Sequence, residues 1–240
     1  MPRPQYTYVM RLLRLSVGKD IHFGVVEDGS SKVVALKGDP LFAPVEPSGP
    51  IFDLSEVDLL APVIPRSKVV IVSQDGVTLK PNTSVVSHSE PVVPLREGKQ
   101  LSVRPTVAAV VRTLSKDLSA EAADKAVLGT LLLGDYRDEF EGNQYSLFDT
   151  STPLGPWMRV GDQPRTFTVQ FPGSQYELAS DRIFEAVQRA SQLCTLLPGD
   201  VVAWEGPVCE VKSGDVVTLT ASALGSLENR IISTKEVFNE

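Results

Sequence analysis

The chain has 240 residues, of which 42% are hydrophobic and 22% charged, and its formal net charge at pH 7 is -7. This composition is typical of a globular protein with one large domain or two smaller ones. The acidic balance excludes a strongly basic nucleic-acid-binding surface, because binding to phosphates requires clustered lysine and arginine.

The sequence favours a cytoplasmic location. The residues that follow Met1 lack the apolar segment of a signal peptide, and no apolar run approaches the about 18 residues of a membrane-spanning helix. Cys194 and Cys209 do not form a C-x-x-C pair, so two reduced thiols are the simplest interpretation. We expect a small-molecule substrate as partner, and neither nucleic acid nor a membrane.

Residues 1–60 predict a small N-terminal β module. Short apolar stretches there are interrupted by Gly18 and by Asp28-Gly29, a typical hairpin turn. The expected elements are strands over 12–17, 21–26 and 33–36, followed by a Gly- and Pro-rich loop over 38–50.

Residues 61–240 predict a larger β-rich domain. Short apolar or alternating runs indicate strands, and they are expected over 68–72, 107–111, 131–133, 167–171, 201–204, 216–221 and 230–232, with short β pieces around Val85 and Val92. The acidic, polar residues 134–152 predict a loop.

Two helices are expected in this domain. The first covers 118–128, with Asp117 or Ser119 as its cap and Gly129 as its end. The second covers 180–193, with Ser180 as its candidate cap. The predicted fold class is therefore mostly β with two or more helices, of the α+β type.

Several segments resemble, in the same order, signatures of the fumarylacetoacetate hydrolase family. They lie at 11–14, 23–26, 59–62, 65–70, 80–84, 153–157 (Pro-Leu-Gly-Pro-Trp), 198–202, 214–217 and 224–229, and span about residues 10–232. The resemblance implies a mixed β-sandwich or roll domain behind a small N-terminal β module, and a homodimer. It also implies metal-dependent cleavage, decarboxylation or tautomerisation of 1,3-diketo acids.

The chain departs from this family at the active site. The first active-site loop, which carries a His and a Glu in the family, is shortened between Val72 and Lys80. The metal-binding Glu-x-Glu pair of the family corresponds to Arg104 and Thr106, and only Asp135 matches a metal ligand. The family's active-site Lys, expected shortly before the Pro-Leu-Gly-Pro-Trp segment, is absent from 143–146.

Mg²⁺ and Mn²⁺ require several oxygen ligands, and one Asp beside an Arg does not provide them. The sequence therefore predicts neither a metal at the family's position nor another cofactor. A relocated metal site in the 135–149 loop is an alternative, because that segment contains Asp138, Glu139, Glu141 and Asp149. A solvated acidic loop is the simpler interpretation.

The residues at the family's pocket predict a polar and aromatic pocket without a metal. The candidate catalytic groups are Asp135 and Glu205 as acid or base, and Arg104 and Arg137 as partners of an enolate. The candidate substrate-binding residues are Thr106, Tyr136, Gln144, Tyr145, Ser146 and Trp204. The two histidines, His22 and His88, are isolated, so no Ser-His-Asp or Cys-His arrangement is expected.

Two roles for Asp135 remain open at this stage. It either transfers a proton, or it has a structural role, in an ion pair with Arg104 or as an acceptor in a turn after 131–133 that Gly134 suggests.

The leading functional hypothesis is a metal-independent biosynthetic isomerase, lyase or cyclase acting on a keto-enol or polyketide-like small molecule. The alternative is a noncatalytic ligand-binding or scaffold protein of the same family. Whether the chain is an enzyme is left open, because function depends on the site and not on the fold.

Overall fold

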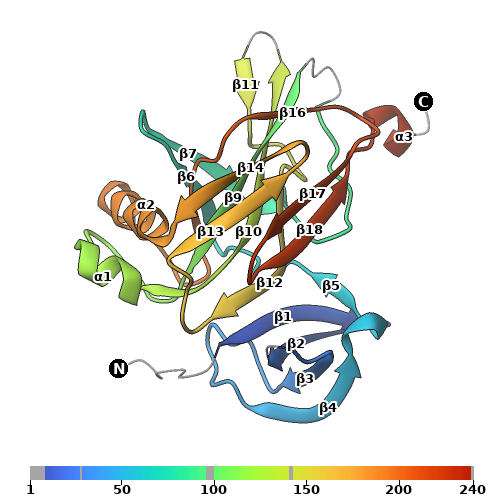
Figure 1. Cartoon of the computed structure of the whole chain (residues 1–240), viewed down its shortest axis with the longest axis vertical. Helices are drawn as coiled ribbons and strands as arrows, with labels where there is room; N and C mark the ends of the chain where they lie inside the picture. Colours follow the sequence, from blue (N-terminus) through green and yellow to red (C-terminus); the bar gives the residue numbers. More distant parts are fainter. Residues whose placement is uncertain (1–8, 28, 96–99, 141–142, 239–240) are drawn as a thin grey trace.

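The computed structural model describes residues 9–27, 29–95, 100–140 and 143–238. Within these residues the chain is built mostly from β-strands, with three α-helices, which confirms the predicted fold class. A sheet of 14 strands runs through the molecule, and a second sheet of four strands packs against it (Figure 1). None of the described helices is long and apolar enough to span a membrane.

The N-terminal β module lies at one end of the molecule (Figure 1). Its first strand is hydrogen-bonded to a strand of the larger domain, with Met10 opposite Val160, so the module extends the main sheet. Leu13, Leu15 and Val33 are buried in a small core of its own. The strands are β1 (Met10–Val17), β2 (Asp20–Glu27), β3 (Lys32–Leu36), β4 (Pro47–Asp53) and β5 (Asp58–Leu60).

The main sheet continues through the larger domain in the order β1-β12-β10-β9-β15-β6-β7. Every residue of β9 is buried, because both faces of this central strand are covered. The strands are β6 (Lys68–Val72), β7 (Val77–Pro81), β8 (Val85–Val86), β9 (Leu101–Val111), β10 (Val127–Phe140), β11 (Asn143–Tyr145), β12 (Thr152–Val160), β15 (Val201–Trp204) and β16 (Cys209–Val211).

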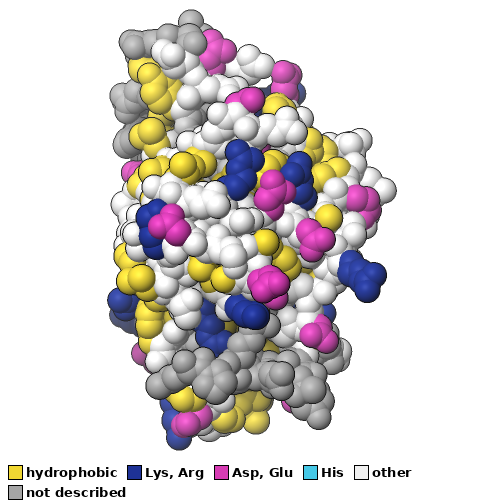
Figure 2. All heavy atoms as spheres, turned by 90° about the vertical axis from the view of Figure 1, so that its left-hand side faces the viewer, with side chains coloured by type: hydrophobic (Ala, Val, Ile, Leu, Met, Phe, Trp, Pro, Cys, Tyr) yellow, Lys and Arg dark blue, Asp and Glu magenta, His cyan; other side chains and the backbone are white. Residues whose placement is uncertain are grey.

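The second sheet and one helix enclose the largest core against β9 and β10. Phe167, Val217 and Leu227 of that sheet meet Ile183 and Val187 of the helix there. The elements are β13 (Thr166–Phe171), β14 (Ser174–Ala179), β17 (Val216–Ala221), β18 (Gly225–Arg230), α1 (Ala120–Lys125), α2 (Ser180–Leu193) and α3 (Thr234–Phe238). Charged side chains of both signs are interspersed on the face that carries α1 and α2 (Figure 2).

Several predicted elements have the bounds that the sequence indicated. Strands 68–72, 201–204 and 216–221 and helix 180–193 are found as β6, β15, β17 and α2. The cap of α2 was predicted wrongly, because Ala179 is the N-cap and the Ser180 hydroxyl donates to the carbonyl oxygen of Pro164.

The helix predicted over 118–128 is shorter. Ser119 caps it, with its Oγ accepting from the Ala122 amide at 3.3 Å, but α1 ends at Lys125. Gly129 does not end a helix; it lies inside β10. A Cβ at Gly129 would lie 2.3 Å from the carbonyl oxygen of Arg159, so glycine is needed for close contact between neighbouring strands.

The predicted loop over 134–152 is also wrong. β10 continues to Phe140, and β11 pairs with its end. The sequence of β10 does not show the apolar–polar alternation of a strand with one exposed face, because both of its faces are buried here. Asp135 is buried by ion pairs on one face, and Tyr136 enters the core on the other. Smaller differences are that β4 begins at Pro47, inside the predicted loop, and that β18 ends at Arg230.

Candidate active site: a buried ion-pair cluster

The candidate site is built on the pairing of β9 and β10. Arg104 lies directly opposite Asp135 in the antiparallel register, so their side chains leave the sheet on the same face. Thr106 and Arg137 share this face because side chains alternate along a strand. The register therefore gathers four of the predicted site residues on one face.

Asp135 is completely buried and both of its carboxylate oxygens are bound by cations. Lys80 on β7 donates from Nζ to Oδ1 at 2.7 Å. Arg137 donates to Oδ2 from Nε at 3.0 Å and from Nη2 at 2.7 Å. Lys80 Nζ also donates to the carbonyl oxygens of Tyr136 and Ser151, at 3.3 and 2.8 Å, so the ammonium has three acceptors.

Glu205 joins a second arginine to this group. Its Oε1 accepts from Arg137 Nη2 at 2.5 Å and lies 3.4 Å from Arg104 Nε. Arg104 also donates to Ser102 Oγ and Gln144 Oε1, both at 3.3 Å. We call Lys80, Arg104, Asp135, Arg137 and Glu205 the ion-pair cluster; three cations and two carboxylates give it one net positive charge.

The cluster keeps Asp135 ionised. Burial opposes the charged form, but the ion pairs with Lys80 and Arg137 outweigh burial and hold the pKa of Asp135 below its ordinary value. Burial lowers the pKa of Lys80, and the Asp135 carboxylate opposes that effect. Because Nζ has three acceptors, as an ammonium requires, we assign a charged pair. Asp135 is therefore poorly suited to proton transfer.

Glu205 is held in position by its backbone. Its amide donates to the Val72 carbonyl at 2.8 Å, and Thr106 Oγ1 donates to the Trp204 carbonyl at 2.7 Å. A Cβ at Gly206 would lie 1.9 Å from the carbonyl oxygen of Pro105, so only glycine fits there. The segment after β15 is therefore pressed against β9, which fixes where the Glu205 side chain begins.

The structure brings together Arg104, Thr106, Asp135, Arg137 and Glu205 of the predicted site, with Gln144 at the edge.

The other predicted residues lie elsewhere. Tyr136 is buried in the main core on the opposite face, where burial raises its pKa. Trp204 also lies on that side, with Arg182 and Arg189 of α2 over its ring at 4.2 and 5.3 Å. Tyr145 packs near Phe140, with ring centroids 6.2 Å apart.

Ser146 is buried, and its carbonyl oxygen accepts from Ser151 Oγ. The predicted aromatic part of the pocket is therefore not found at the cluster.

Two expectations for Asp135 were also wrong. The predicted ion pair with Arg104 does not form; Asp135 binds Lys80 and Arg137 instead. Asp135 does not lie in a turn, because β10 continues through it.

Sequence reasoning assigned no role to Lys80. Hydropathy predicts the opposite orientation of this strand, with Leu79 buried and Lys80 exposed. In the structure Lys80 is buried, whereas its apolar neighbour Leu79 is 54% exposed. The available signal was Asp135 itself, since a buried carboxylate requires cationic partners.

The cluster does not fit a divalent metal. Both oxygens of Asp135 are occupied by cations, and Arg104 and Thr106 offer no carboxylate. No three His, Cys, Asp or Glu side chains converge anywhere within the described part of the chain. Of the residues of the alternative relocated site, Glu141 lies outside the described residues.

Asp138 lies on the opposite face of β10 from the cluster. It is 1% exposed; Oδ2 accepts from the Leu95 amide at 3.0 Å, and Oδ1 is buried without a donor. Burial raises the pKa of Asp138, because its charged form is poorly solvated. This is the opposite of the situation at Asp135.

Neither histidine contacts the cluster. His22 packs against Phe52, with ring centroids 5.4 Å apart. His88 Nδ1 accepts from the Glu228 amide at 3.2 Å, and burial lowers the pKa of His88.

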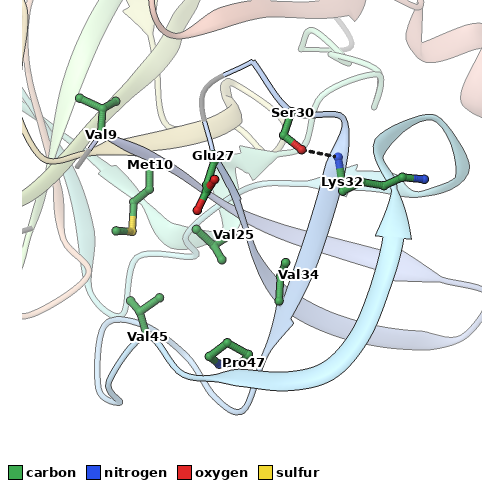
Figure 3. A pocket seen from close by; sticks show the side chains of 9 residues that line it. All are labelled: Val9, Met10, Val25, Glu27, Ser30, Lys32, Val34, Val45 and Pro47. Atoms are coloured by element: carbon green, nitrogen blue, oxygen red, sulfur yellow. Dashed lines mark hydrogen bonds between the residues drawn. The ribbon is translucent and has the colours of Figure 1, made fainter.

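A separate open cavity of about 850 Å³ lies in the N-terminal module (Figure 3). Its walls are mainly aliphatic, and Lys32 at its rim is ion-paired with Asp53. It is lined by Val9, Met10, Val25, Glu27, Ser30, Lys32, Val34, Val45 and Pro47, so it shares no residue with the ion-pair cluster.

The chain belongs to the fumarylacetoacetate hydrolase family, as the sequence predicted. Residues 60–232 match the family model described as fumarylacetoacetate (FAA) hydrolase C-terminal. Residues 10–62 match a second model, described as Rv2993c-like, N-terminal.

Three of the similar proteins come from mycobacteria. Protein Rv2993c of Mycobacterium tuberculosis is 27% identical over 230 residues, covering 81% of this chain and 84% of that protein. The 2-hydroxyhepta-2,4-diene-1,7-dioate isomerase of Mycobacterium marinum has a TM-score of 0.83 at 26% identity, covering 94% of this chain and 99% of that one. The 5-carboxymethyl-2-hydroxymuconate delta-isomerase of Mycobacterium smegmatis has a TM-score of 0.82 at 25% identity, covering 93% and 100%.

Proposed function

We propose that this chain is a metal-independent member of the family, which binds a small keto-enol anion at the ion-pair cluster and moves a proton on it. The reaction class is that of an isomerase, lyase or cyclase in a biosynthetic route. The observation that carries the proposal is the charge of the cluster: it has one more cation than carboxylates, so it attracts an anion without a metal.

Arg104 is the residue proposed to hold the anion. Its guanidinium has five N–H groups, and its described hydrogen bonds go only to Ser102 and Gln144. The remaining donors suit the paired oxygens of a carboxylate or the oxygen of an enolate, since charge-assisted hydrogen bonds are the strongest available. Gln144, beside Arg104 at the edge of the cluster, is proposed to contact the same ligand.

Glu205 is the residue proposed to move the proton. Its side chain is 28% exposed, whereas that of Asp135 is sealed at 0%. Glu205 would take a proton from the carbon next to a carbonyl, leaving an enolate that Arg104 stabilises, and would return the proton to another carbon of the same conjugated system. The net change is an isomerisation, with no redox partner and no leaving group.

The solved relatives support an isomerase, because the proteins from M. marinum and M. smegmatis are both described as isomerases. The predicted homodimer, the cytoplasmic location and the domain division at residue 60 stay predictions.

Proton exchange gives a direct test. Protein freed of metal with a chelator is incubated in D₂O with a panel of 2-oxo acids, including oxaloacetate and acylpyruvates, and exchange at the carbon next to the carbonyl is followed by proton NMR. We expect enzyme-dependent exchange that Glu205→Gln reduces by about 10²–10⁴-fold. The matched control is Glu177→Gln, an exposed carboxylate on β14.

Exchange that is absent from the chelator-treated protein and returns when Mg²⁺ or Mn²⁺ is added, or exchange that Glu205→Gln leaves intact, contradicts the proposal. Binding of an oxo acid without any exchange supports the second candidate, a noncatalytic ligand-binding protein. The complete burial of Asp135 favours that candidate, because the carboxylate that the sequence matched to a family metal ligand is bound by Lys80 and Arg137.

A further inference from the structure

Two carboxylates from separate segments meet at one guanidinium. Asp135 comes from β10 and Glu205 from the segment after β15, and Arg137 donates to both, at 2.7 and 2.5 Å from the same Nη2 atom. Carboxylates that converge on one largely buried cation are also what a divalent metal site requires. Here the cation belongs to the chain itself.

Arg137 is the member of the cluster best placed for this role. Lys80 binds Asp135 through Oδ1 and otherwise donates to backbone carbonyls. Arg104 Nε lies 3.4 Å from Glu205 Oε1 and does not bond to Asp135. Among the described residues, Arg137 is the cation that pairs with both carboxylates. Its planar guanidinium can do this because it carries several donors in a fixed geometry.

We infer that Arg137 substitutes for the divalent cation of the family, by joining Asp135 to Glu205 and supplying the positive charge of the site. The inference deepens the proposed function, since it explains why no metal is needed. It makes no use of a substrate, so it can be tested separately.

The inference predicts which changes would create a metal site. Arg104→Glu and Thr106→Glu together restore two carboxylates on β9, but leave Arg137 bound to Asp135. Adding Arg137→Ser releases Asp135 Oδ2 and removes the competing charge. Affinity for a hard cation rises with the number of free carboxylate ligands, so only the triple variant has a suitable set.

The experiment measures Mn²⁺ binding by electron paramagnetic resonance and calorimetry without substrate. We expect no saturable site in the unmodified protein and weak binding in the Arg104→Glu/Thr106→Glu variant. The triple variant is expected to bind one Mn²⁺ per chain at least about tenfold more tightly than the double variant. Arg230→Ser, an exposed position on β18, replaces Arg137→Ser in a control triple that loses the same charge.

Three results would overturn the inference. One is saturable Mn²⁺ binding to the unmodified protein that Asp135→Asn abolishes. The second is equal Mn²⁺ affinity in the double and triple variants. The third is an equal gain in affinity from Arg230→Ser. In the last two cases Arg137 would not compete with the metal.

A single substitution keeps the inference testable if the triple variant does not fold. Arg137→Gln removes the shared cation, and we expect Tm to fall by about 5–10 °C, while Mn²⁺ and chelator leave the Tm of the unmodified protein unchanged. An unchanged Tm in Arg137→Gln would refute the bridging role. A failed proton-exchange assay would refute the proposed function and leave these results unaffected.

Discussion

Lys80 and Asp135, 55 residues apart in sequence, form an ion pair of 2.7 Å in which neither side chain is exposed to solvent. The pair connects β7, at the edge of the main sheet, to β10 near its centre. Asp135, which the sequence matched to a metal ligand of the family, thus lies inside a network of the chain's own cations.

Loss of Lys80 should destabilise the fold strongly. In Lys80→Met the methionine fills similar space but leaves Asp135, within the described part of the chain, with the cation of Arg137 alone. We expect a loss of about 3–5 kcal/mol in the free energy of unfolding. Urea denaturation followed by circular dichroism measures it. Lys32→Met, which breaks the exposed pair with Asp53, should lower the free energy of unfolding much less. Equal losses in the two variants would show that the buried pair stabilises the fold no more than the exposed pair does.

Asp135→Asn should remove an acid-sensitive part of the stability. The ion pairs lower the pKa of Asp135 in the folded state, so its contribution is present above the unfolded value of about 3.9 and is lost as pH falls through the folded pKa. We expect the variant to be less stable than the unmodified protein at pH 7, and the gap to narrow towards pH 2. Unfolding free energies from pH 2 to 7 test this, and a constant gap would contradict it.

Asp138→Asn should have the opposite pH dependence. Burial raises the pKa of Asp138. Ionisation of Asp138 therefore costs the folded protein stability: the free energy of unfolding is not reduced below about pH 3.9, and it declines as pH rises through the folded pKa. The amide oxygen can still accept from Leu95. We therefore expect the variant to gain about 1–3 kcal/mol at pH 7 relative to the unmodified protein.

The gain should vanish near pH 3. The same pH series of unfolding experiments measures it, and a variant that is less stable at every pH would argue against an uncompensated carboxylate at Asp138.

Gly206→Ala should disturb the position of Glu205. The added Cβ would lie 1.9 Å from the Pro105 carbonyl oxygen, so the segment after β15 must move away from β9. We expect lower stability and loss of any Glu205-dependent proton exchange. Gly76→Ala, where a Cβ meets open space, is the control, and unchanged exchange in Gly206→Ala would mean that the position of Glu205 is not critical.

Elements whose signal is local could be predicted from the sequence. The structure has the expected bounds for the apolar runs at 68–72 and 201–204 and for the periodic helix at 180–193. These elements could be predicted because the hydrophobicity of neighbouring residues indicates a buried strand or one buried helix face. β10 was cut short in the prediction, because Asp135 and Arg137 on this strand also bind Lys80 and Glu205, which lie far away in the sequence.

The sequence alone determined the family and the fold class, and it predicted that Arg104 and Thr106 replace the family's paired carboxylates, since these inferences depend on residue identities in a fixed order. Only the tertiary structure decided which cations bind Asp135 and that Tyr136 and Trp204 turn to the opposite face. The physical reason is that strand register sets the direction of each side chain, and a buried charge must take its partner from whichever strand the fold brings near.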